Sequence, residues 1–374
     1  MGEVVGAALL AHVPTIVLPE EIRRELNNGE DSTLPAALEQ LRKEVFETLD
    51  YDTVVVLDSH WATTVEFVVT AHARRQGLFT SEELPRGMSQ RPYDFPGDPE
   101  LAHLIAAKAA QHGTWITAIE DDHLPIFYAT TNVWEFLGQG LPDKRWISIG
   151  VCQTADTEDN LRLGRALGDA IAESDRKVVL IASGALSHTF WPLRKLRDHE
   201  AAGPEHIFTP EAYKADMERL EWFAAGDHAR VLSTMPDFYR YKPEARFGHY
   251  LMMIGALGEA IARRPAGSTA STRTRSAPVR CISGSTARRP ASPAPGAPSR
   301  IPTTSARRRE RLTKCAKRAG SCWTATSSMW SAGTTPSSRT TDARSRSMTR
   351  STCPRSYRRR SSVSISTTPP ASRR

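Results

Sequence analysis

Short apolar runs and longer amphipathic segments alternate along residues 4–262. Apolar or β-branched runs of about four to eight residues are typical of buried strands, and apolar residues at helical spacing are typical of helices. Strands that alternate with helices indicate an α/β fold with a mostly parallel central sheet covered by helices. The pattern predicts strands over 4–12, 53–60, 65–72, 115–120, 145–151 and 177–184, and helices over 34–49, 99–113, 159–174, 211–227 and 248–262.

This alternation stops near residue 263. Residues 264–374 are rich in Ser, Thr, Arg, Pro and Ala, and they show no sustained apolar period. A segment of this composition buries too little apolar surface to offset the entropy of folding. We therefore predict a single folded domain over residues 1–263 and a low-complexity, disordered basic tail over residues 264–374.

The charge of the chain divides at the same place. The tail has 24 Lys and Arg against two acids, Glu310 and Asp342, which is a net charge of +22. Because the whole chain carries +7, residues 1–263 carry −15. A basic arm suits binding to nucleic acid, so a nucleic-acid-binding protein that acts through its tail is one hypothesis for the function.

The compartment is predicted from three further features. No apolar run reaches the 18 or so residues that a membrane-spanning helix needs, so we expect no membrane partner. The first residues include Glu3 and no basic cluster, which is a poor match to a signal peptide. Cys152 is the only cysteine before the tail, and the tail cysteines lack zinc-ligand spacing. We therefore expect a cytoplasmic protein.

Three predicted strands are followed closely by a histidine, at His12, His60 and His188. In a parallel sheet the carboxyl ends of the strands meet at one edge, where active residues gather. The plain interpretation of each histidine is a capping or loop residue. Three together favour a shared site.

Two neutral imidazoles and one carboxylate form the ligand set of non-haem Fe(II) oxygenases, which leaves positions open for substrate and dioxygen. Glu244 precedes an apolar helix and is the candidate carboxylate. It has an alternative interpretation as a helix N-terminal acid stabilised by the dipole. Histidines with a carboxylate also suit zinc, so a zinc hydrolase is a further alternative.

Dispersed motifs carry a resemblance to a known family. The segments LLAHVPT, VVVLDSHW, IASGALSH and PEARFGHYLMM, in this order, resemble the class III extradiol ring-cleavage dioxygenases, the superfamily of the protocatechuate 4,5-dioxygenase catalytic subunit. FTSEELPRG and DPELA are similar to its 3,4-dihydroxyphenylacetate 2,3-dioxygenase branch. The resemblance covers about residues 4–260.

The resemblance implies a role for each matching residue. His12 and His60 match the iron-binding histidines, Glu244 matches the iron-binding carboxylate, and His188 matches the acid/base histidine. Asp58 is expected to orient an imidazole, as ligating histidines usually require.

The sequence departs from the family in one place. Many members carry an Asp-His-Gly element in the middle of the chain, where this chain has IFYATTN, with Tyr128 near the histidine position. His123 and His249 are candidates to replace the proton donor that the histidine of this element would supply. The candidates for binding the ring substituent of the substrate are Trp61, Arg246, His249 and Tyr250.

The implied function is extradiol opening of a catechol ring with O2 and Fe(II), with 3,4-dihydroxyphenylacetate as the expected substrate. Members of the family are usually oligomers, so we expect a homo-oligomer, and we expect no specific nucleic-acid partner. The alternatives are a non-catalytic member of the superfamily and the nucleic-acid-binding protein described above.

A frameshift is a second hypothesis for the tail. Arg, Ser, Thr, Pro and Ala are what a GC-rich gene yields in a wrong frame, and the tail has only two lysines. With codons chosen for the purpose, residues 268–286 read in a neighbouring frame give QYGEYENSIGTGQVHLWFD, which resembles the C-terminal segment of the family. We therefore predict a frameshift near residues 260–267.

Overall fold

The computed structural model describes residues 1–199, 201–258 and 281–282. The predicted α/β fold is confirmed. Its main sheet has the strand order β6-β3-β7-β2-β8-β1-β9. All neighbouring strands are parallel except β3 with β7 and β1 with β9. The strands are β1 (Glu3–Leu10), β2 (Thr53–Thr63), β3 (Phe67–Thr70), β6 (Ile116–Ile119), β7 (Arg145–Cys152), β8 (Lys177–Ser183) and β9 (Cys281–Ile282).

The six predicted strands correspond to β1, β2, β3, β6, β7 and β8. The sequence missed a separate antiparallel hairpin of β4 (Arg74–Phe79) and β5 (Arg91–Pro96). Its strands are largely polar and half exposed, so they lack the apolar run that marks a buried strand. The loop that joins them, residues 80–90, contributes to the site described below.

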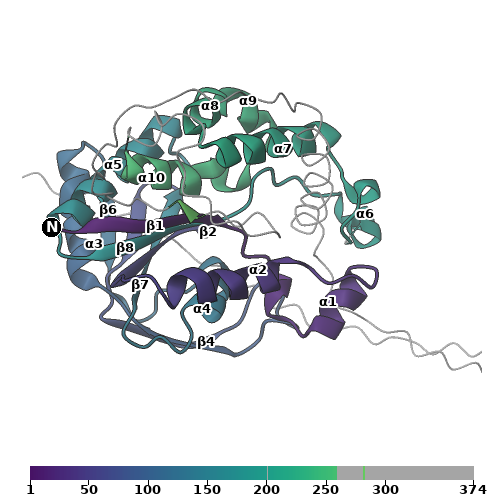
Figure 1. Ribbon diagram of the computed structural model, residues 1–374, viewed down its shortest axis with the longest axis horizontal. Coiled ribbons are helices and arrows are strands. Elements are labelled where there is room, and N and C mark those ends of the chain that lie inside the picture. Colours follow the sequence, from purple (N-terminus) through teal and green to yellow (C-terminus); the bar gives the residue numbers. More distant parts are fainter. Residues whose placement is uncertain (200, 259–280, 283–374) are drawn as a thin grey trace, which may run out of the picture. The chain divides into compact units, whose positions relative to one another are not determined.

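Helices cover both faces of the sheet (Figure 1). One face carries α3 (Pro99–Gln111), α5 (Thr157–Glu173) and α10 (Gly248–Leu257), and the other carries α2 (Leu34–Leu41) and α4 (Tyr128–Leu137). The predicted helix over 34–49 is divided, because α2 passes into a π-helical turn at Arg42–Phe46. The remaining described helices are α1 (Glu20–Leu26), α6 (Leu193–Leu196), α7 (Pro210–Ala225), α8 (His228–Ser233) and α9 (Met235–Phe238), with short 3-10 turns at Pro14–Val17, Arg197–His199, Pro204–His206, Tyr239–Tyr241 and Glu244–Phe247.

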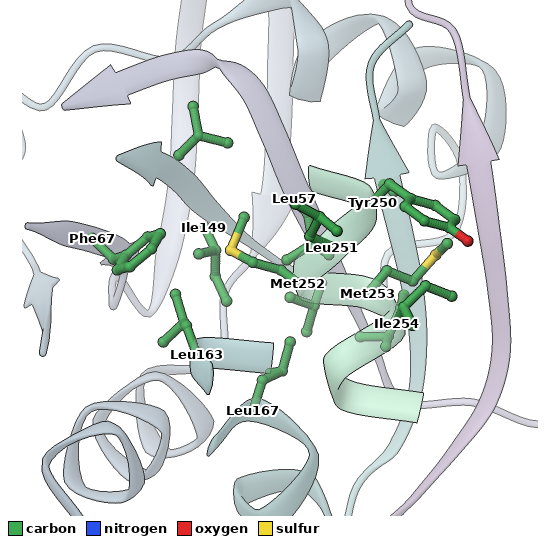
Figure 2. Packing of buried hydrophobic residues seen from close by; sticks show 14 of the residues in the cluster. Leu57, Phe67, Ile149, Leu163, Leu167, Tyr250, Leu251, Met252, Met253 and Ile254 are labelled. Carbon is green, nitrogen blue, oxygen red and sulfur yellow. The ribbon is translucent and has the colours of Figure 1, made fainter. Parts of the chain in front are cut away.

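The apolar core lies on both sides of β2. Val54 and Val56 belong to the cluster under α2 and α4, whereas Val55 and Leu57 belong to the cluster under α5 and α10. A strand that is covered on both faces is apolar at every position, which explains the continuous run in the sequence. Figure 2 shows Leu57 near Leu251 and Met252 of α10.

The predicted disordered tail and the predicted frameshift lie almost entirely outside the described residues. Among the helices that the structure describes, none combines the length and the apolar character that crossing a membrane requires.

Candidate metal centre

The sheet brings the candidate histidines to one edge. Strands β1, β8 and β2 are adjacent and parallel, so their carboxyl ends lie side by side. His12 follows β1, His60 lies near the carboxyl end of β2, and His188 follows β8. The order of these strands in the sheet was not predictable from their order along the chain.

His12, His60 and Glu244 meet at this edge. The Nε2 atoms of His12 and His60 each lie 3.4 Å from Oε1 of Glu244. One ligand atom from each of the three residues lies within 4.8 Å of the others. His12 and Glu244 are buried, and His60 is half buried. A single cation placed among these atoms would have two nitrogen ligands and one oxygen ligand.

The tautomer of His12 follows from its hydrogen bonds. Its Nδ1 lies 2.9 Å from the hydroxyl of Ser183, and that hydroxyl donates its own hydrogen to the carbonyl of Ala129 at 2.6 Å. The hydroxyl must therefore accept from His12, so the proton of the neutral imidazole is on Nδ1. The lone pair is then on Nε2, which faces Glu244 and is free to bind a metal.

The carboxylate of Glu244 is held from two sides. The hydroxyl of Ser59 donates to Oε1 at 2.6 Å, and the backbone N–H of Ala185 donates to Oε2 at 2.5 Å. Burial alone would raise the pKa of Glu244, but His12 and His60 outweigh it and hold the pKa well below its ordinary value. The group is therefore an anion, as a metal ligand must be.

His60 is surrounded by acids and a phenol. Its Nδ1 lies 3.9 Å from Oε1 of Glu83, and its Nε2 lies 2.6 Å from the hydroxyl of Tyr128. The same hydroxyl donates to Glu83. Burial alone would lower the pKa of His60, but the attraction of Glu244 and Glu83 raises it.

The segment that carries His188 is bound to the segment that carries Glu244. The backbone N–H of His188 donates to Lys242, and that of Glu244 donates to Leu186, so the two segments run side by side as a short antiparallel bridge. Burial lowers the pKa of His188, so its imidazole is neutral near pH 7 and able to accept a proton.

The backbone directly after Glu244 is strained. Ala245, Arg246 and Phe247 have φ values of 46°, 52° and 64°, in the left-handed region that favours glycine. Such conformations persist where the surrounding structure enforces them, often at functional sites. Here the turn changes the direction of the chain between Glu244 and helix α10.

Asp58 contacts the backbone of His60, and its role in orienting the imidazole stays a prediction. Its carboxylate accepts hydrogen bonds from the backbone N–H groups of His60 and Trp61 and from the hydroxyl of Thr130. It therefore fixes the backbone at the end of β2, whereas Glu83 and Tyr128 contact the imidazole of His60. Trp61 is buried, with its ring against Gly150 of β7.

The other predicted residues are dispersed. His123 is exposed in a turn, and Arg246 is exposed with its guanidinium over the ring of Tyr239. Tyr250 is buried, and its hydroxyl contacts His228. His249 is fully buried against Gly184, and neither of its ring nitrogens has a hydrogen-bond partner among the described residues.

Sequence reasoning missed three residues that support the centre. Glu83 stands in FTSEELPRG, a motif that carried the resemblance without receiving a role. Ser59 and Ser183 stand in VVVLDSHW and IASGALSH, the motifs that also contain His60 and His188. Their place in the motifs was the only signal, because a serine shows no chemistry until its hydrogen-bond partner is known.

A family model matches most of the chain. Residues 6–279, more than half of the chain, match the family described as the catalytic LigB subunit of aromatic ring-opening dioxygenase. The chain is 27% identical over 263 residues to 3,4-dihydroxyphenylacetate 2,3-dioxygenase of Escherichia coli, which covers 69% of this chain and 91% of that one.

Two further matches are more distant. The chain is 24% identical over 268 residues to the 2-aminophenol 1,6-dioxygenase beta subunit of a Pseudomonas species, over 68% of this chain and 86% of that one. A solved structure of uncharacterized protein JW3007 from Escherichia coli K12 aligns with a TM-score of 0.46 and 17% identity, over 67% of this chain and 88% of that one.

Proposed function

The chain belongs to the LigB family of aromatic ring-opening dioxygenases, and we propose that it is an extradiol enzyme with Fe(II) held by His12, His60 and Glu244. The observation that carries this proposal is the convergence of these three side chains at one sheet edge, although Glu244 lies more than 180 residues beyond both histidines in sequence. Two imidazoles and a carboxylate suit Fe(II), and they leave room for other ligands.

The fit to a divalent cation rests on the protonation states of His12 and Glu244, whereas Nε2 of His60, which donates to the hydroxyl of Tyr128, would release its proton when a metal binds. Ser183 fixes the proton of His12 on Nδ1, and Glu244 is an anion. The bound metal would orient the catechol and dioxygen and offset the negative charge that develops on them. Membership of the family favours this proposal over the nucleic-acid-binding hypothesis and over a non-catalytic role.

His188 is the proposed acid and base. It is neutral because burial lowers its pKa, so it accepts a proton from one catechol hydroxyl and later returns it to the product. The hydroxyl of Tyr128 lies 2.6 Å from Nε2 of His60. Tyr128 stands near the chain position where many members of the family have a histidine, and we propose that it orients the bound substrate ring. Overall, one catechol and one O2 give one ring-opened product that contains both oxygen atoms.

We propose 3,4-dihydroxyphenylacetate as the substrate, because the relative with that activity aligns over 91% of its own length. We also propose a homo-oligomer; the family description and the name of the second relative both use the word subunit, which supports an assembled state. Localisation in the cytoplasm stays a prediction.

Oxygen uptake tests the proposal. Fe(II)-loaded protein is given 3,4-dihydroxyphenylacetate, protocatechuate, 2,3-dihydroxyphenylpropionate, 2-aminophenol and the non-catechol control 3-hydroxyphenylacetate. We expect one O2 consumed per ring with 3,4-dihydroxyphenylacetate, together with a visible absorption band from the ring-opened product. Faster uptake with 2-aminophenol would overturn the substrate proposal, and uptake with none of the dihydroxy or aminophenol compounds would overturn the function.

A further inference from the structure

Asp216 is a buried acid outside the metal centre. It lies on α7 with 7% of its surface exposed. Its carboxylate accepts two hydrogen bonds from one residue: the backbone N–H of Ser187 at 3.1 Å and the hydroxyl of Ser187 at 2.5 Å. Ser187 is the residue directly before His188.

The segment around Ser187 is hydrogen-bonded on two sides. On one side the segment around Ser187 pairs with residues 242–244, through the bonds of Leu186 and His188 described above. On the other side Asp216 binds both hydrogen-bond donors of Ser187. The chain is therefore held from two directions at the position that sets where the imidazole of His188 points.

Burial of this acid is costly. Burial raises the pKa of Asp216 to about 7, although the bonds from Ser187 oppose the rise. An apolar side chain would avoid the cost of removing a carboxyl group from water. A contribution to the placement of Ser187 accounts for an acid at this position.

We propose that Asp216 is a positioning residue for His188, because it fixes the backbone and hydroxyl of Ser187 and so directs the imidazole toward the metal centre. This inference rests on the proposed acid/base role of His188. It predicts that Asp216 affects proton transfer, with little effect on metal binding, since none of its described hydrogen bonds reaches a proposed metal ligand.

Variants of the pair separate geometry from charge. We expect Asp216→Ala to lower kcat by about 10- to 100-fold, since small misplacements have effects of this size, while KM and iron content stay within about twofold. Asp216→Asn should keep most of the activity, because its amide oxygen can accept from the N–H of Ser187 while its NH2 donates to the hydroxyl. Ser187→Ala loses one of the two hydrogen bonds, so its kcat should lie between those of Asp216→Ala and Asp216→Asn. Glu221→Gln, at an exposed position of the same helix, is the matched control.

A double variant and an NMR titration complete the test. His188→Ala should already remove the whole contribution of the acid/base residue to kcat. Adding Asp216→Ala to this variant should therefore lower kcat no further. In metal-free protein, Asp216→Ala should raise the pKa of the His188 imidazole toward its ordinary value, because the freed residue becomes more exposed. Removal of a negative charge alone would lower it instead.

The inference is overturned if Asp216→Ala keeps full kcat, if its loss adds to that of His188→Ala, or if the pKa of His188 stays the same or falls. The NMR result does not depend on turnover. A wild-type protein that opens no ring would overturn the proposed function, while a raised pKa of His188 would still support the placement of this residue by Asp216.

Discussion

At the scale of single residues, the hydroxyl of Ser183 fixes the tautomer in which His12 can bind a metal. It accepts from Nδ1 of His12 and donates to the carbonyl of Ala129. Ser183→Ala would leave Nδ1 of His12 without this partner in a buried site and free the imidazole to change tautomer. We expect the affinity for Fe(II) to fall by about 10- to 100-fold, measured by anaerobic titration. Unchanged affinity would show that the tautomer is fixed by another group.

Asp216 also makes stability depend on pH. Its ordinary pKa is 3.8, and burial raises the pKa to about 7 in the folded protein. The folded state therefore holds this proton more tightly than the unfolded state, so the contribution is full below pH 4 and is lost as the pH rises to 7. Relative to Asp216→Asn, the free energy of unfolding of wild type should fall by up to about 4 kcal/mol across this range. Urea unfolding of both proteins at several pH values measures this difference. Parallel pH curves for the two proteins would contradict the raised pKa.

At the scale of elements, helix α10 depends on a close contact with α5. A Cβ at Gly164 would lie 2.3 Å from the carbonyl of Met252, so an alanine forces the two helices apart. Because α10 follows Glu244 almost directly, we expect Gly164→Ala to destabilise the protein by about 1–3 kcal/mol and to weaken metal binding. Thermal unfolding and metal titration measure both effects. Arg165→Ala, exposed on α5, is the control, and equal behaviour of the two variants would refute the link.

The elements also show what the sequence could predict. The strands that carry the histidines were found because their apolar runs are long and end abruptly. Helix α4 was missed because Thr130, Thr131 and Val133 favour strands, and its packing on the sheet overrides that preference. The hydrogen bonds from the backbone of His60 and Trp61 to Asp58 were not predicted, because spacing along a strand does not reveal which hydrogen-bond donors a side chain reaches. Glu83 reaches His60 through a hairpin that has no apolar signature.

At the scale of the whole molecule, the charge of −15 over residues 1–263 contrasts with +22 over the tail. The predicted frameshift explains this contrast without a second function. We expect resequencing to show a one-base difference near the codons for residues 260–267, and the corrected chain to resist thermal unfolding better. A clean read that encodes the present tail would refute the frameshift. Salt-dependent DNA binding that is lost on deletion of residues 264–374 would then support the nucleic-acid hypothesis.

The most direct test of the central claim compares iron content and oxygen uptake in wild type, Glu244→Ala and His188→Ala. Glu244→Ala should lose the metal and the activity together. His188→Ala should keep its iron but lose turnover by about 10²- to 10⁴-fold, the usual contribution of a general acid or base. Equal iron content in all three proteins, or full turnover by His188→Ala, would contradict the assigned roles.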